Sequence, residues 1–82
     1  MKTKLNLPKI TLILIKNNQK RFIYPSIRKT QNFLRNKAES YLKNDYLITF
    51  KVLYKDGGSN SGTYYRISDL NWAYQAFIRE YL

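Results

Sequence analysis

The chain has 82 residues, of which 44% are hydrophobic and 16% aromatic, so one small folded core fits and a second does not. Fifteen Lys and Arg residues against five Asp and Glu residues give a net charge of +10, a very basic balance for this length. Cysteine and histidine are both missing from the sequence, which excludes disulfides, thiol nucleophiles and the commonest metal ligands. We therefore expect no enzyme activity, no metal and no cofactor.

The first elements along the chain are expected to be a basic arm and a β-hairpin. Residues 1–8 are basic and end in a proline, which favours a flexible arm before the fold. Lys9–Lys16 has apolar side chains at both odd and even positions, which predicts a buried strand. Residues 17–20 predict a hairpin loop, and Arg21–Tyr24 a short second strand that Pro25 ends.

A helical period begins after Pro25 and predicts an amphipathic helix. Ser26 is a favourable N-cap residue, and Asn44 tolerates the left-handed conformation that often ends a helix. Apolar residues recur along one side of this segment, and basic and amide residues along the other. We expect one continuous helix between these two residues.

The second half of the chain repeats the order strand, strand, helix. Tyr46–Lys55 alternates between apolar and mixed positions and predicts the clearest strand. The glycine-rich residues 56–62 predict a loop, and Thr63–Ile67 a returning strand. Ser68 is expected to cap the last helix. Residues 9–82 are thus expected to form one α+β domain of order ββαββα, with two helices on one face of a mainly antiparallel four-stranded sheet.

The excess positive charge belongs entirely to the first half of the chain. Residues 1–43 contain eleven Lys and Arg residues and one acidic residue, Glu39, whereas residues 44–82 contain four of each sign. Such a one-sided distribution creates an electrostatic field with a direction. The basic half, residues 9–44, is therefore expected to carry the electrostatic footprint of the protein, whereas residues 45–82 form a charge-balanced half.

Basic side chains of the first hairpin and of the outer face of the first helix are the predicted contacts to nucleic acid. Lys and Arg that neutralise phosphates release counterions, and Arg donates two parallel hydrogen bonds to a phosphate. The predicted set consists of Lys16, Lys20, Arg21, Arg28, Lys29, Arg35 and Lys43. This pattern favours a small non-enzymatic protein that binds the phosphate backbone of DNA or RNA.

The aromatic residues divide between a core role and a contact role. Phe22 and Tyr24 flank the basic hairpin tip, where exposed rings would stack on single-stranded bases. Because a small core needs most of the thirteen aromatic residues, a core role is favoured for each ring. Trp72 projects away from the apolar side of the last helix, near Arg79, as residues at protein interfaces do. Packing of Trp72 against the first helix or the chain end is equally compatible with the sequence.

Two further functions remain open from the sequence. A protein–protein inhibitor or adaptor, such as a phage or mobile-element anti-defence protein, would use Trp72, Arg79, the tyrosines and the positive face against an acidic or nucleic-acid-binding surface of its partner. A structural subunit of a ribonucleoprotein would use the basic charge and the arm. No stretch approaches the about 20 apolar residues that cross a bilayer, so a soluble cytoplasmic protein without a membrane partner is expected.

Overall fold

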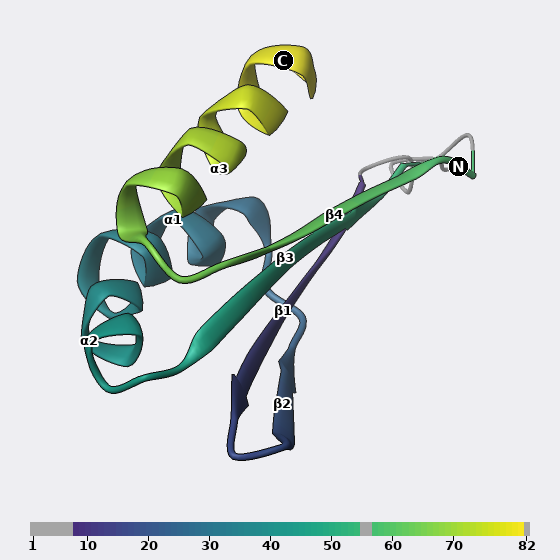
Figure 1. The fold of residues 1–82 in the computed structure, drawn as a ribbon. Helices are drawn as coiled ribbons and strands as arrows, with labels where there is room; N and C mark the ends of the chain where they lie inside the picture. Colours follow the sequence, from purple (N-terminus) through teal and green to yellow (C-terminus); the bar gives the residue numbers. More distant parts are fainter. Residues whose placement is uncertain (1–7, 55–56, 82) are drawn as a thin grey trace.

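The structure, a computed structural model, describes residues 8–54 and 57–81, the side chain of Tyr81 excepted. These residues form one four-stranded antiparallel sheet and three helices in the order ββααββα (Figure 1). The predicted α+β class and the antiparallel four-stranded sheet are confirmed. Residues 1–7 of the predicted arm lie outside the described residues.

The sheet has the strand order β2-β1-β3-β4. Strands β1 (Lys9–Lys16) and β2 (Gln19–Ile23) form the first hairpin, and strands β3 (Leu47–Leu53) and β4 (Ser59–Tyr64) form the second. The two hairpins join through β1 and β3, which pair along almost their whole length. The most apolar strands therefore occupy the centre of the sheet, and β2 and β4 form its edges.

Both hairpins differ from their predicted bounds. Asn17 and Asn18 have φ values of 54° and 66°, as a two-residue type I′ turn requires. Asn tolerates this left-handed conformation, so β2 begins at Gln19 and not at Arg21. In the second hairpin, β4 already begins at Ser59, inside the predicted loop. Backbone pairing with β3 explains this difference, because ladder hydrogen bonds do not require apolar side chains.

The predicted continuous helix is in fact two helices that meet at Lys37. Helix α1 (Ile27–Asn36) begins as expected, because the Ser26 hydroxyl accepts a 3.2 Å hydrogen bond from the Lys29 N–H. Lys37 has a φ of −128°, which interrupts the helical geometry before α2 (Ala38–Lys43). After this break α2 packs against β3 as well as against α1. The apolar period continues through the break, which is why the sequence predicted a single helix.

The last helix, α3 (Ile67–Tyr81), begins two residues earlier than predicted. Its Leu70 N–H donates to the Arg66 carbonyl at 3.1 Å, so Ser68 lies inside the first turn and does not occupy the N-cap position. The preceding strand ends at Tyr64 and not at the predicted Ile67. The helix thus includes the end of the segment that alternation assigned to a strand.

The three helices lie together on one side of the sheet (Figure 1). Alternate residues of β1 and β3 point toward them, as the predicted alternation requires. Phe50 contacts Tyr74 and Phe77 of α3 edge to face, with ring centroids 6.1 and 5.8 Å apart. The core consists of Ile10, Leu12, Leu14, Leu34, Ala38, Ile48, Phe50, Val52, Leu70, Tyr74 and Phe77.

Candidate nucleic-acid interface

The opposite face of the sheet is not covered by any part of the chain that the structure describes (Figure 1). Strand register arranges its side chains in rows that cross the sheet. The central row, read from β2 to β4, consists of Phe22, Ile13, Thr49 and Thr63. The adjacent rows consist of Lys20, Ile15 and Leu47, and of Thr11, Lys51 and Ser61. The last row consists of Lys9, Leu53 and Ser59. We use the name open face for these four rows together with Tyr24, which lies just past the end of β2.

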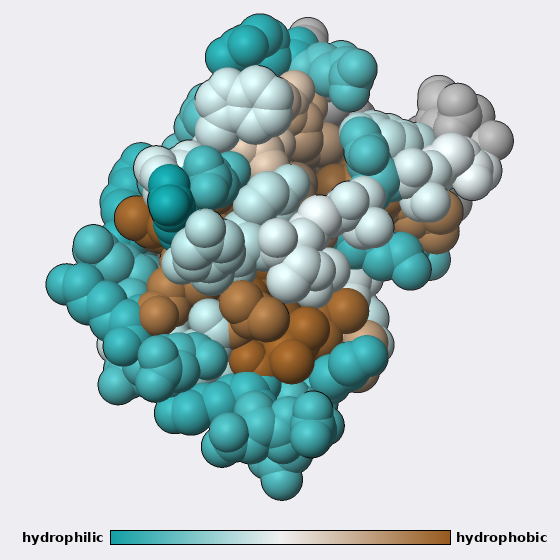
Figure 2. Space-filling view, in the orientation of Figure 1, coloured by the Kyte–Doolittle hydropathy of each residue, from teal (hydrophilic) through white to brown (hydrophobic). Residues whose placement is uncertain are grey.

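Large side chains are exposed on the open face. Phe22 is 50% exposed and Tyr24 75% exposed, and their rings are nearly parallel, with centroids 6.5 Å apart. Leu47 and Leu53 are also exposed. Figure 2 shows apolar side chains at the surface in the lower half of the view, with hydrophilic side chains below them. The open face thus offers flat rings and apolar surface to a partner.

The core role that composition favoured for each ring is wrong for Phe22 and Tyr24. The alternation of side chains along the strand indicates the exposure of Phe22 and Tyr24, which composition did not. Ile23 lies between these two residues and is the one partly buried residue of β2. In a strand with a single buried position, the residues on either side of that position point to the other face. Their exposure follows from that pattern once the covered face is known.

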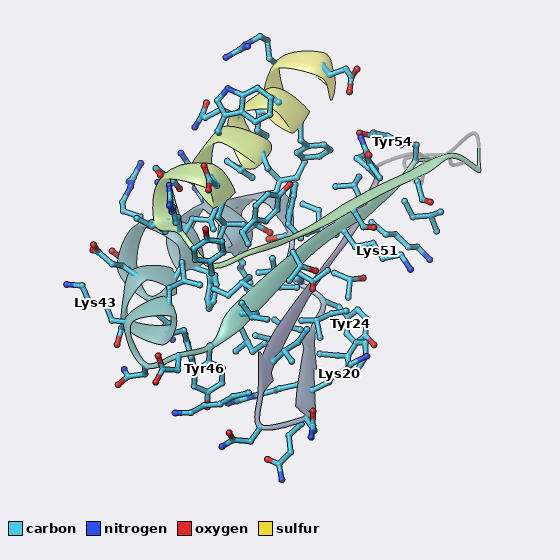
Figure 3. The ribbon with its side chains drawn as sticks, viewed as in Figure 1. Lys20, Tyr24, Lys43, Tyr46, Lys51 and Tyr54 are labelled. Atoms are coloured by element: carbon cyan, nitrogen blue, oxygen red, sulfur yellow. The ribbon has the colours of Figure 1, made fainter. Side chains whose placement is uncertain are left out.

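Positive charge accompanies the exposed rings. Lys20, Tyr24 and Lys51 lie on the side of the sheet away from the helices (Figure 3). None of the four strands contains Asp or Glu. The acidic residues that the structure describes lie in helices or in the turn between α2 and β3: Glu39, Asp45, Asp69 and Glu80. Within the described part of the chain, the open face therefore carries positive charge only.

The three predicted hairpin cations divide between the two faces. Lys20 lies on the open face, whereas Lys16 and Arg21 alternate to the helix side. Lys16 Nζ lies 5.1 Å from the ring centroid of Tyr46. All three cations nevertheless line one hollow at the hairpin end. The hairpin tip thus collects positive charge, as predicted, next to one end of the open face.

The four predicted helix cations do not share one face. Arg28 lines a crevice beside β1, and Arg35 lines a groove between α1 and α3. Lys29 is exposed on α1. Lys43 belongs to α2, so the break at Lys37 removes it from the helical register of the others. Arg28 alone of these four lines a crevice that residues of the open face also line.

Trp72 of α3 is 71% exposed, so its ring is not packed in the core of the protein. It lines a groove of about 230 Å³ between α3 and β4, together with Ala76, Phe77 and Gly62. The outer edge of β4 has no neighbouring strand among the described residues. Arg79 is exposed on the same helix and is not among the residues that line the groove.

No protein-family model, curated protein or solved structure matches this chain. Among the described residues, no three His, Cys, Asp or Glu side chains lie close enough to hold a metal ion. None of the described helices is long and apolar enough to cross a membrane. The open face, its rings and its charge are therefore the basis for inferring function.

Proposed function

We propose that this protein binds single-stranded nucleic acid on the open face of its sheet. The supporting observation is the exposed, nearly parallel pair of Phe22 and Tyr24 on a face whose charged residues, as far as the structure describes them, are all cations. Exposed sheet aromatics stack on unpaired bases in several nucleic-acid-binding modules. Lys20 and Lys51 would contact the phosphates on either side of the stacked bases, with Lys16 and Arg21 close by at the hairpin tip.

A single strand fits this surface better than a duplex does. The bases of a duplex stack on one another, so their flat sides are not available to protein rings. A four-stranded sheet is also too broad for the major groove, which admits a helix or a two-stranded ribbon. Stacking tolerates every base, so we expect weak sequence preference and binding of both DNA and RNA single strands.

Fluorescence anisotropy with labelled single-stranded oligonucleotides tests this proposal. Alanine substitution at a stacking ring costs about 1–3 kcal/mol per base, so a Phe22→Ala/Tyr24→Ala variant should bind at least about tenfold more weakly. Trp72→Ala is the matched control, because it removes an exposed aromatic residue from the helix side. The affinity of this control for the oligonucleotide should stay within about twofold of that of the unmodified protein. Equal losses for both variants, or no binding by the unmodified protein, would overturn the proposal.

Trp72 favours a second candidate, a protein partner bound at the groove between α3 and β4. An unpaired strand edge beside a groove accepts an extended segment as an added strand, and an exposed Trp is a typical anchor residue. For such an inhibitor or adaptor, Trp72→Ala should weaken the protein complex while the open-face variant leaves it unchanged. Trp72 emission should be red-shifted in the free protein, should move to the blue on binding of a protein partner, and should not change with an oligonucleotide.

A further inference from the structure

β2 is shorter than β1, and this difference leaves a crevice beside the start of β1. β2 pairs with β1 from Leu12 onward, so Lys9–Thr11 has no neighbouring strand on that side in the described part of the chain. Beyond Tyr24 the chain crosses from the sheet to the beginning of α1. The crevice between these segments has a volume of about 860 Å³.

Three cations from three elements line this crevice: Lys9 of β1, Arg28 of α1 and Lys51 of β3. Its described lining contains no Asp or Glu, and none of the three cations forms an ion pair with a described residue. Like charges held close together disfavour the folded state unless an anion neutralises them. The hydroxyl groups of Thr11 and Tyr24 add neutral hydrogen-bond donors. This combination is typical of a site for a phosphate group.

We propose that the crevice binds the terminal phosphate of a single strand whose bases lie on the open face. This inference rests on the proposed function. A terminal phosphate carries about −1.5 to −2 charges at pH 7, whereas each internal phosphate carries about −1. Three cations that line one crevice therefore match a strand end better than they match the strand interior. Arg28 can donate two parallel hydrogen bonds to such a group.

Tyr24 connects the crevice to the stacking surface. Its side chain lines the crevice and also stacks on Phe22. A terminal base stacked on this pair would therefore have its own phosphate at the crevice, and the rest of the strand would continue toward Lys20. The 5′ and 3′ phosphates share the chemistry that the crevice recognises, so the experiment must distinguish them.

The test measures binding of one oligonucleotide sequence in three forms: with a 5′ phosphate, with a 3′ phosphate, and with hydroxyl groups at both ends. The label sits at an internal position. Charge-assisted hydrogen bonds to a phosphate predict about tenfold tighter binding of one phosphorylated form than of the hydroxyl form. The preferred form identifies the strand end that the crevice holds.

Two matched variants assign this preference to the crevice. Lys9→Gln/Arg28→Gln should abolish the preference, which is the ratio of the affinities of one variant for the phosphorylated and hydroxyl forms. The hydroxyl form itself should also bind more weakly to this variant, because Lys9 belongs to the open face as well. Lys29→Gln/Arg35→Gln removes the same charge from outside the crevice and should retain the preference. Equal binding of all three forms, or a preference that survives in the crevice variant, would overturn the inference and leave the proposed function intact. Failure of every form to bind would instead overturn the proposed function.

Discussion

The two faces of the sheet come from the same strands but differ in what covers them. Leu12 and Phe50, opposite each other on β1 and β3, are 0% and 5% exposed beneath the helices. One position along, Ile13 and Thr49 are opposite each other on the open face. The covered face consists of core residues, whereas the open face presents rings and lysines that no described element packs on. Folding accounts for the residues of the covered face, and for the open face we propose binding.

Charge separates the two faces in the same way. The helices contain Glu39, Asp69 and Glu80 beside their Lys and Arg residues, so the helix side is of mixed sign. The strands contain only cations among their charged residues. The positive charge that is concentrated in the first half of the sequence is therefore, in part, concentrated in the sheet, whereas the helices carry charges of both signs.

The largest expected effect is a difference in the free energy of unfolding between variants of the covered face and variants of the open face. Phe50→Ala removes a buried ring that contacts Tyr74 and Phe77, and it should lower the free energy of unfolding by about 3–5 kcal/mol. Phe22→Ala, on the open face, should lower it by about 1 kcal/mol or less. Urea unfolding followed by circular dichroism measures both. Similar losses for the two variants would remove the distinction between a structural and a binding face.

The next largest effect is a difference in the salt dependence of oligonucleotide binding between charge-removing variants of the open face and of the helix side. Each phosphate contact to a single strand contributes about 0.7 to the slope of log affinity against log salt. Lys20→Gln/Lys51→Gln should therefore lower the slope by about 1.4. Arg35→Gln/Lys43→Gln removes the same charge from the helix side and should leave the slope nearly unchanged. Equal changes in slope would mean that net charge alone attracts the nucleic acid.

A smaller effect concerns the helices that cover the core. Ser26→Ala removes the hydroxyl that accepts the Lys29 N–H, so the free energy of unfolding should fall by about 0.5–2 kcal/mol. Ser68→Ala should change it by a few tenths of a kcal/mol at most, because Ser68 is not an N-cap and Ala is the better helix former. Thermal melting of both variants checks this difference. Binding of an oligonucleotide with hydroxyl groups at both ends should be unchanged in each well below the melting temperature, since neither residue belongs to the open face and Ser26 lines only the crevice.

The smallest effect is a pH dependence on the covered face. Burial raises the pKa of the Tyr74 phenol above its ordinary value of 10.0. The folded protein therefore retains this proton at a pH where the unfolded chain loses it, so stability should fall as the pH rises above about 10. Tyr74→Phe should remove that part of the decline. Urea unfolding at pH 9 and pH 11 measures it, and an equal decline in both proteins would contradict the assignment.

The sequence predicted the parts of the fold that depend on local patterns. Alternation in Tyr46–Lys55 placed Phe50 on an apolar face, and the Ser26 cap began the first helix where predicted. The strand order depends on which hairpins meet in space, which a period of two does not specify. The break at Lys37 was also missed, because the apolar period runs through it.

Only some residues of the candidate site could be predicted, because the site depends on how the strands pair and on which face of the sheet the helices cover. Charge counting selected Lys20, which lies on the open face, and Arg28, which lines the crevice. It missed Lys51, which lies in the charge-balanced half and joins the site through pairing of β1 with β3. Alternation indicates which residues share a face but not which face the helices cover. The exposure of Phe22 and Tyr24 therefore emerges only from the assembled layers.

Nuclear magnetic resonance of the ¹⁵N-labelled protein, titrated with a single-stranded oligonucleotide, tests the central claim most directly. Binding on the open face predicts that the largest amide shifts occur in β2 and along β1 and β3, around Phe22, Tyr24 and Lys51. The amides of α3 around Trp72 should hardly move. Shifts concentrated in α1, α2 or α3, with the open-face strands unchanged, would contradict the account.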